Sequence, residues 1–227
     1  MKHLLNAFIL CLTLLIGSID LKAQQQFIGI KFGAGPVSIV SSELNNPSSG
    51  EGISTGLLYN YLAKSRFTFG TELLYERRGY ADRYFLNMFD PSGPKATVPT
   101  YFEYLCLPVS AGYTFGNRFH VKPSVGVCPG ILVRATTTYD ATGIYQPDFA
   151  NNYKPTYKTV DIKNTASDFN FSVFADISFG YNISRQMDVS LSTRFQEGLT
   201  PILKSDSKPF WNNDLYLCLG LRYCLTK

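Results

Sequence analysis

The segment Phe169–Tyr181 reads FNFSVFADISFGY, and its apolar residues recur at every second position. One parity comprises Phe171, Val173, Ala175, Ile177, Phe179 and Tyr181. The other parity is small or polar, with Phe174 as its single apolar member. Because alternate side chains of a strand point to opposite faces, the segment predicts a β-strand with one apolar and one polar face.

The same alternation returns along the chain, in segments long enough to cross a bilayer at a tilt. We expect strands at residues 26–38, 52–62, 66–80, 101–114, 119–134, 169–182, 186–196 and 212–224. A length of 227 residues suits a single all-β domain. The pattern therefore predicts an all-β fold, an eight-stranded antiparallel up-and-down transmembrane β-barrel.

The connections between these segments alternate strictly in length. Short connections lie at 63–65, 115–118 and 183–185, and long polar ones at 39–51, 81–100, 135–168 and 197–211. Outer-membrane barrels have short periplasmic turns and longer external loops. We therefore expect every long loop at the external end and both termini at the periplasmic end.

Aromatic residues gather near both ends of the apolar face. Tyr61, Phe67, Tyr113, Phe119, Tyr181 and Tyr223 fall near the short connections, and Tyr75, Tyr101, Phe171 and Phe195 near the long ones. The positions between them are mainly Leu, Val and Ile. Two aromatic belts around an aliphatic band are typical of membrane proteins, although Tyr and Phe also favour strands of soluble proteins.

The polar face carries acidic and basic residues in nearly equal number. They are Lys31, Glu72, Glu76, Arg78, Lys122, Arg134, Asp176, Asp188, Arg194, Asp214 and Arg222. Eight strands enclose an interior that side chains can fill, and buried charges are tolerated there when they are paired. We predict a lumen plugged by an ion network, with a narrow charged conduit as the alternative.

The N-terminus has the features of a secretory signal. Lys2 precedes the apolar run Leu4–Ile16, and Leu21-Lys22-Ala23 ends in a small residue. We expect residues 1–23 to be a cleaved signal peptide and residues 24–227 to form the outer-membrane barrel domain, since the run is shorter than the roughly 20 residues of a spanning helix. Without residues 1–23 the chain keeps 19 basic and 16 acidic residues, which predicts no nucleic-acid partner.

The remaining cysteines are Cys106, Cys128, Cys218 and Cys224, with no Cys-x-x-Cys pair. Cys106 and Cys128 share the inward parity on both sides of the turn at Gly116-Asn117. An oxidising compartment permits a disulfide between them, and two free thiols are the alternative. Because the whole chain has only two histidines, we expect no metal and no cofactor.

No catalytic constellation accompanies the strands. After residue 23 the only histidine is His120, near a short connection and far from the long loops, whereas a hydrolase needs Ser and His within reach of each other. We therefore expect no catalytic residues and no enzyme activity. The loop 135–168 carries Tyr139, Tyr145, Tyr153 and Tyr157. It predicts either a recognition surface for protein or glycan, or a loop packed over the barrel mouth.

Four short motifs stand out: Glu72–Gly79 (ELLYERRG), Tyr104–Val109 (YLCLPV), Pro123–Leu132 (PSVGVCPGIL) and Gly198–Ile202 (GLTPI). Together they resemble the PorT-like outer-membrane β-barrel family of Gram-negative bacteria. Cys106 stands where that family usually has Glu, and the chain continues past Tyr223, where such barrels commonly stop at an aromatic residue. The resemblance implies an integral outer-membrane protein with no catalytic residues, and some members are associated with protein secretion.

The sequence thus predicts a non-enzymatic outer-membrane barrel that is an interaction or structural component of the envelope, or a secretion-associated subunit. Its expected partners are outer-membrane lipid and, through the external loops, envelope or secretion proteins. One alternative is a soluble periplasmic barrel that binds a small apolar ligand, which requires the Leu and Val parity to face inwards. The other is a narrow outer-membrane pore.

Overall fold

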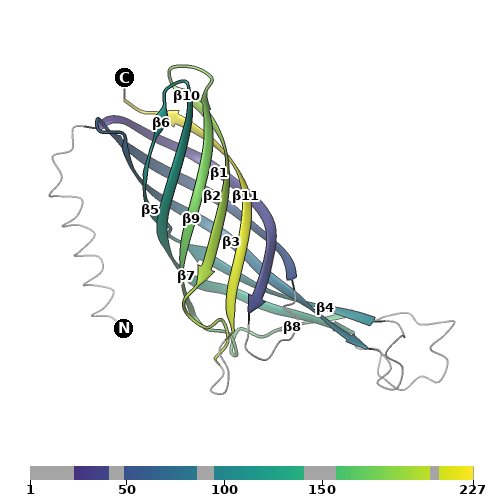
Figure 1. The fold of residues 1–227 in the computed structure, drawn as a ribbon. Coiled ribbons are helices and arrows are strands. Elements are labelled where there is room, and N and C mark those ends of the chain that lie inside the picture. Colours follow the sequence, from purple (N-terminus) through teal and green to yellow (C-terminus); the bar gives the residue numbers. More distant parts are fainter. Residues whose placement is uncertain (1–22, 41–48, 86–94, 141–156, 205–209, 227) are drawn as a thin grey trace, which may run out of the picture.

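The computed structural model describes residues 23–40, 49–85, 95–140, 157–204 and 210–226. Its strands are β1 (Ala23–Val40), β2 (Ser49–Ala63), β3 (Phe67–Phe85), β4 (Lys95–Cys106), β5 (Val109–Tyr113), β6 (Phe115–Gly116), β7 (Phe119–Asp140), β8 (Tyr157–Asp161), β9 (Phe169–Asn182), β10 (Met187–Gly198) and β11 (Trp211–Cys224). Figure 1 shows them as one barrel with a sheet that runs out obliquely at one end. Residues 1–22 of the expected signal peptide lie outside the described residues, and its last residue, Ala23, begins β1.

Antiparallel pairing closes the sheet into a ring. The order around it is β1, β2, β3, then β4 with β5, then β7, β9, β10 and β11, which pairs with β1 again. Because β4, β5 and β6 follow one another along one wall, the ring has eight positions. The predicted eight-stranded antiparallel barrel is confirmed, and a closed ring leaves no free sheet edge inside a membrane.

Leu107 and Pro108 separate β4 from β5, which otherwise form one continuous strand of the wall. The interruption arises because proline has no backbone N–H to donate to a neighbouring strand. The wall nevertheless stays continuous. The Leu107 N–H donates to the Pro129 carbonyl, and the Pro108 carbonyl accepts from the Glu72 N–H, both at 2.9 Å.

The two ends of the barrel differ. Short turns near residues 64–66, 117–118 and 183–186 lie at the end that carries the C-terminus. At the other end β3, β4 and β7 continue past the ring, and β8 pairs with the last residues of β7. We call these strand ends, together with β8, the external extension.

The external extension corrects the prediction that residues 81–100 and 135–168 are loops throughout. Residues 81–85, 95–100, 135–140 and 157–161 are strand. Thr100 pairs its hydroxyl with Thr137, and Thr138 with Thr159, each at 2.9 Å. These residues favour strands but are polar, so the alternation that marks the barrel wall is absent here.

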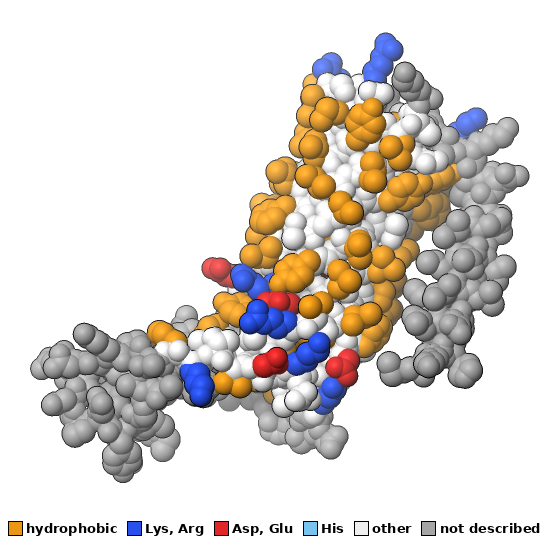
Figure 2. Space-filling view, turned by 180° about the vertical axis from the view of Figure 1, so that it is seen from behind, with side chains coloured by type: hydrophobic (Ala, Val, Ile, Leu, Met, Phe, Trp, Pro, Cys, Tyr) orange, Lys and Arg blue, Asp and Glu red, His pale blue; other side chains and the backbone are white. Residues whose placement is uncertain are grey.

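The wall turns its aliphatic parity outwards. Leu57, Val125 and Ile177 are 54%, 65% and 51% exposed, and the charged parity is buried in the lumen. Figure 2 shows hydrophobic side chains over the wall, with acidic and basic side chains together towards the end with the external extension and further basic ones at the opposite end. The soluble ligand-binding barrel required the opposite arrangement, so that alternative was wrong. Among the described residues, no helix has the length and apolar character to cross a membrane.

Candidate functional site

The lumen is filled by three groups of ionic side chains. The middle group joins Lys31, Glu72, Asp176 and Arg194, which come from β1, β3, β9 and β10. Lys31 Nζ lies 3.3 Å from Glu72 Oε1 and 3.2 Å from Asp176 Oδ2. Arg194 Nη2 lies 2.8 Å from Glu72 Oε1, and its Nε lies 3.3 Å from Asp176 Oδ2. Two basic and two acidic side chains thus link four strands of the barrel across the lumen.

The external group lies nearer the external extension and centres on Arg78. Arg78 pairs with Glu76, and its Nε lies 3.2 Å from Asp214 Oδ2. Its Nη1 also donates to Asn170 Oδ1 at 2.8 Å, and Asn212 Nδ2 donates to Asp214 at 2.9 Å. Two buried carboxylates therefore share one guanidinium group and are supported by neutral amides.

The periplasmic group lies near the short turns and centres on Arg222. Arg222 pairs with Asp188 and donates to Asn60 Oδ1 at 3.2 Å. His120 Nε2 lies 3.0 Å from Arg222 Nη2 and 3.3 Å from Asp188 Oδ2. The ring fits only because Gly180 has no side chain, since a Cβ there would lie 2.1 Å from Nε2.

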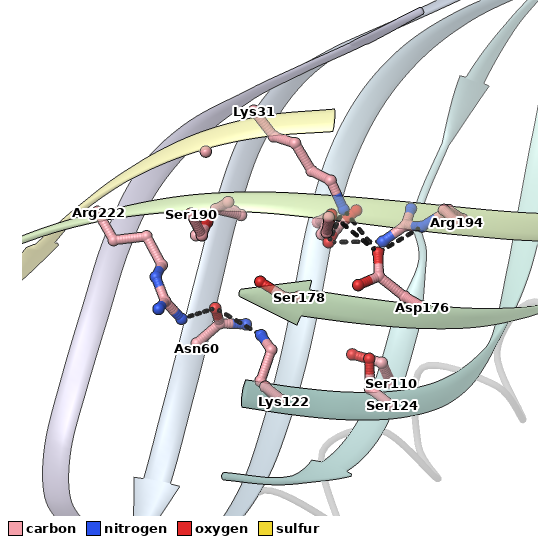
Figure 3. A pocket seen from close by; sticks show the side chains of 14 residues that line it. Lys31, Asn60, Ser110, Lys122, Ser124, Asp176, Ser178, Ser190, Arg194 and Arg222 are labelled. Atoms are coloured by element: carbon pink, nitrogen blue, oxygen red, sulfur yellow. Dashed lines mark hydrogen bonds and ion pairs between the residues drawn. The ribbon is translucent and has the colours of Figure 1, made fainter. Parts of the chain in front are cut away.

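A small cavity lies among the middle and periplasmic groups (Figure 3). Its volume is about 20 Å³, which is room for about one water molecule. Lys122 lines it and lies 3.5 Å from Asn60 Oδ1. Serine hydroxyls complete the lining: Ser110, Ser124, Ser178, Ser190 and Ser192. A cavity of this size holds a water molecule but no larger solute.

Apolar side chains pack together at the mouth of the barrel on the side of the external extension. Phe102 and Leu132 of the wall pack with Ala166, which follows β8, and Ile202, which follows β10. The two connections are tied together, because the Ser167 N–H donates to the Ile202 carbonyl at 2.9 Å. We call this cluster the mouth plug. In its described part, 162–168, the predicted long loop therefore packs over the mouth.

The predicted loop tyrosines are less informative. Tyr157 begins β8 and is exposed. Tyr145 and Tyr153 lie outside the described residues, as does the side chain of Tyr139. A recognition role for them stays a prediction.

The residues of the predicted aromatic belts all lie on the outward face, exposed or half-buried. They are Tyr61, Phe67, Tyr75, Tyr101, Tyr113, Phe119, Phe171, Tyr181, Phe195 and Tyr223. Tyr113 packs edge-on against Phe67, with ring centroids 5.3 Å apart, and Arg118 lies 5.3 Å from the Tyr181 ring. This arrangement places rings next to basic side chains close to the short turns, as membrane interfaces favour.

Of the predicted lumen charges, one was assigned to the wrong side. Arg134 is exposed, because β7 makes a bulge against β4: Glu103 pairs with Arg134, but Tyr104 pairs with Leu132. The extra residue, Val133, moves Arg134 to the outer face. The other predicted charges point inwards.

Cys106 and Cys128 are free thiols rather than a disulfide. Gly116 pairs with His120, which places Cys106 opposite Gly130 and not opposite Cys128. The two sulfurs and a Glu76 oxygen lie within 4.8 Å of one another. However, Arg78 already neutralises Glu76, and its charge opposes a cation at this cluster.

The neutral members of the network, namely Asn60, Asn170, Asn212 and Gln196, were not predicted from the sequence, whereas the inward position of His120 was. Asn170 bridges Arg78 and Asn212, and Gln196 donates to Ser172 at 2.9 Å. These four neutral residues are buried at the inward parity. Their parity was visible in the sequence, but the prediction considered charged residues alone.

The family described as "Outer membrane protein beta-barrel domain" matches residues 22–204. The chain belongs to this family. It is therefore an outer-membrane β-barrel protein, and its exposed aliphatic wall contacts membrane lipid. No curated protein matches the sequence.

Several solved structures are similar to this outer-membrane barrel. Neisserial surface protein A is 18% identical, with 87% of this chain and 96% of that one covered and a TM-score of 0.44. OprG of Pseudomonas aeruginosa is 9% identical, with 91% and 98% covered and a TM-score of 0.47. The attachment invasion locus protein Ail of Yersinia pestis, solved with the heparin analogue sucrose octasulfate, is 12% identical, with 88% and 99% covered and a TM-score of 0.39.

Proposed function

We propose that this outer-membrane protein is a closed, non-enzymatic barrel that presents its external extension to other envelope components. The filling of the lumen by paired side chains supports the proposal. Three ionic groups and the mouth plug leave a cavity of about 20 Å³ between the walls. A solute pathway needs a continuous water-filled lumen, which eight strands do not provide when inward side chains fill it.

The environment of His120 supports a non-enzymatic role. Its Nε2 atom faces Arg222 and Asp188, and the ring packs over Gly180 inside the barrel. A general base needs a free nitrogen within reach of a nucleophile and of a substrate. His120 is instead packed among Arg222, Asp188 and Gly180 near the short turns.

The external extension suits contact with other molecules. In β8, Tyr157, Lys158 and Thr159 are exposed, and among the described strands β8 pairs with β7 alone. An edge strand offers backbone hydrogen bonds to an extended partner segment. A secretion-associated subunit role, which the resemblance to PorT-like proteins implies, is one form of this contact.

Planar-bilayer conductance tests the closed lumen. We expect no steady conductance from the wild-type barrel, while the Glu72→Ala and Arg194→Ala double variant, which empties the middle group, opens brief conducting events. A steady wild-type conductance that both substitutions alter would instead establish the narrow pore.

Site-specific photo-crosslinking in intact cells tests the contact. A photoreactive residue at Tyr157 should give a discrete crosslinked envelope protein, and one at Arg185, exposed in a short turn, should not give that product. Identical products from both positions, or none from Tyr157, would remove the interaction role.

A further inference from the structure

The bulge in β7 creates a charged cluster on the outer wall. Glu103 of β4 lies between Arg77 of β3 and Arg134 of β7, since it is the register partner of both. Neighbouring strands lie about 4.8 Å apart, so the two arginine backbones are about 10 Å apart on one face of the sheet. Lys163 joins them, because its Nζ donates to the Val133 carbonyl at 2.9 Å. We call Arg77, Glu103, Arg134 and Lys163 the bulge cluster.

The contacts within the bulge cluster leave the guanidinium groups of Arg77 and Arg134 able to bind an anion. The Tyr75 hydroxyl lies close to the Glu103 carboxylate, and Arg77 and Arg134 lie near the same hydroxyl. Arg77 lies 4.9 Å from the centre of the Tyr101 ring. The ion pairs of the described residues include none that joins Arg77 or Arg134 to a carboxylate. The nearby Asp161 accepts a hydrogen bond from the Lys163 backbone N–H at 2.8 Å.

The position of the bulge cluster relative to the apolar wall is well defined. The next outward-facing row towards the short turns consists of Tyr75, Leu105 and Ile131, which are 39%, 47% and 63% exposed. On the other side the wall continues into the threonine-rich external extension. The bulge cluster is therefore the first charged row beyond the hydrocarbon-facing band, at the level where lipid headgroups lie.

We propose that the bulge cluster binds a phosphate group of an outer-leaflet lipid. Arginine matches phosphate with paired N–H donors, and two guanidinium groups with a lysine beside them can hold one phosphate from three sides. Three basic groups face two carboxylates here, counting Asp161, so a net positive charge remains for an anion. An arginine at the edge of the hydrocarbon also needs a polar partner, and a lipid phosphate supplies one.

Binding of lipid A to the purified full-length barrel in non-ionic detergent tests this site. The probes are bisphosphorylated lipid A and the same lipid after removal of its phosphates, compared by native mass spectrometry. The variant is R77Q/R134Q, and the matched control K64Q/R185Q removes two exposed basic charges at the short turns. Each basic group near a lipid surface contributes modestly, so we expect phosphorylated lipid A to bind about tenfold more weakly to R77Q/R134Q. The control should bind it like the wild type.

Two results would overturn the proposal. One is equal binding of the phosphorylated and dephosphorylated lipids by the wild type. The other is an equal loss of lipid A binding in R77Q/R134Q and in the control, which would show that binding depends only on the net charge of the protein. A heat-dependent shift in gel mobility verifies that each variant is folded. If R77Q/R134Q does not fold, the single variant R134Q decides the question, because Arg134 is exposed and its loss empties no buried position.

Discussion

Arg194 Nη2 donates a hydrogen bond of 2.8 Å to Glu72 Oε1 from the opposite side of the barrel. Three wall positions lie between β10 and β3 in either direction around the eight-position ring, so this pair spans the lumen directly. Arg194 also stacks its guanidinium group 4.2 Å from the Phe174 ring. The single apolar residue on the polar face of β9 therefore has a defined role, as the surface on which this cation rests.

Replacement of Arg194 by leucine should strongly destabilise the barrel. Removing one partner from a buried ion network leaves a charge without compensation, at a cost of about 3–5 kcal/mol. Urea unfolding of the protein reconstituted in lipid vesicles measures this cost. Thr193→Leu is the control, because Thr193 neighbours Arg194 on β10 but faces outwards. If R194L costs no more than T193L, the middle group does not stabilise the fold.

The thiol of Cys106 donates to Glu76 Oε2 at 3.5 Å, in a group where two carboxylates already share Arg78. Cys106→Glu would add a third carboxylate to this group. We expect a loss of about 3 kcal/mol or more at neutral pH, because the added charge has no unshared cation. Cys106→Ser retains a donor and should cost about 1 kcal/mol. Equal stability of the two variants in urea unfolding would contradict this account.

The inside and outside of the barrel were predictable because the membrane acts on every second residue of each strand. A lipid-facing position must be apolar, so the parity of Lys31 or Arg222 fixes its side without knowledge of any contact. For Arg134 the parity gave the wrong face. Leu132 and Ala135 both point inwards across the bulge, and nothing in the local sequence marks the extra residue.

The contacts between strands were less predictable than the face of the wall on which each residue lies. Cys106 and Cys128 share the inward face as expected, but the register follows from the Gly116 turn and places Pro108 rather than Cys106 opposite Cys128. The external extension was missed for a related reason. Thr136, Thr137 and Thr138 lie in the external extension, past the apolar rows of the wall, so this part of the strand shows no alternation of apolar and polar residues.

Gly180→Ala should act through His120. The new Cβ would lie 2.1 Å from the present Nε2 position, so the ring must leave Arg222 and Asp188. Overpacking of this kind costs about 1–3 kcal/mol. In the His120→Ala background the clash is absent, and the same substitution should cost much less. A double-mutant cycle from urea unfolding measures the coupling. Additive costs would show that Gly180 has another role.

The depth of a wall position in the bilayer should set the cost of a charge placed there. Leu191 lies near the middle of β10 and pairs with Leu219, whereas Met187 begins the same strand at the short turns. Both side chains face outwards, 47% and 40% exposed. Leu191→Arg should destabilise the barrel in vesicles by about 2–4 kcal/mol, and Met187→Arg by about 0–1 kcal/mol, because hydrocarbon surrounds only the first.

Cysteine labelling at the same two positions is a second test of which one contacts lipid and which one contacts water. Single cysteines at 191 and 187 should react differently with a maleimide dissolved in water, which cannot reach the bilayer centre. We expect the cysteine at 187 to be labelled and the one at 191 to be protected until detergent replaces the lipid. Equal arginine costs combined with rapid aqueous labelling at 191 would mean that this face of β10 meets solvent.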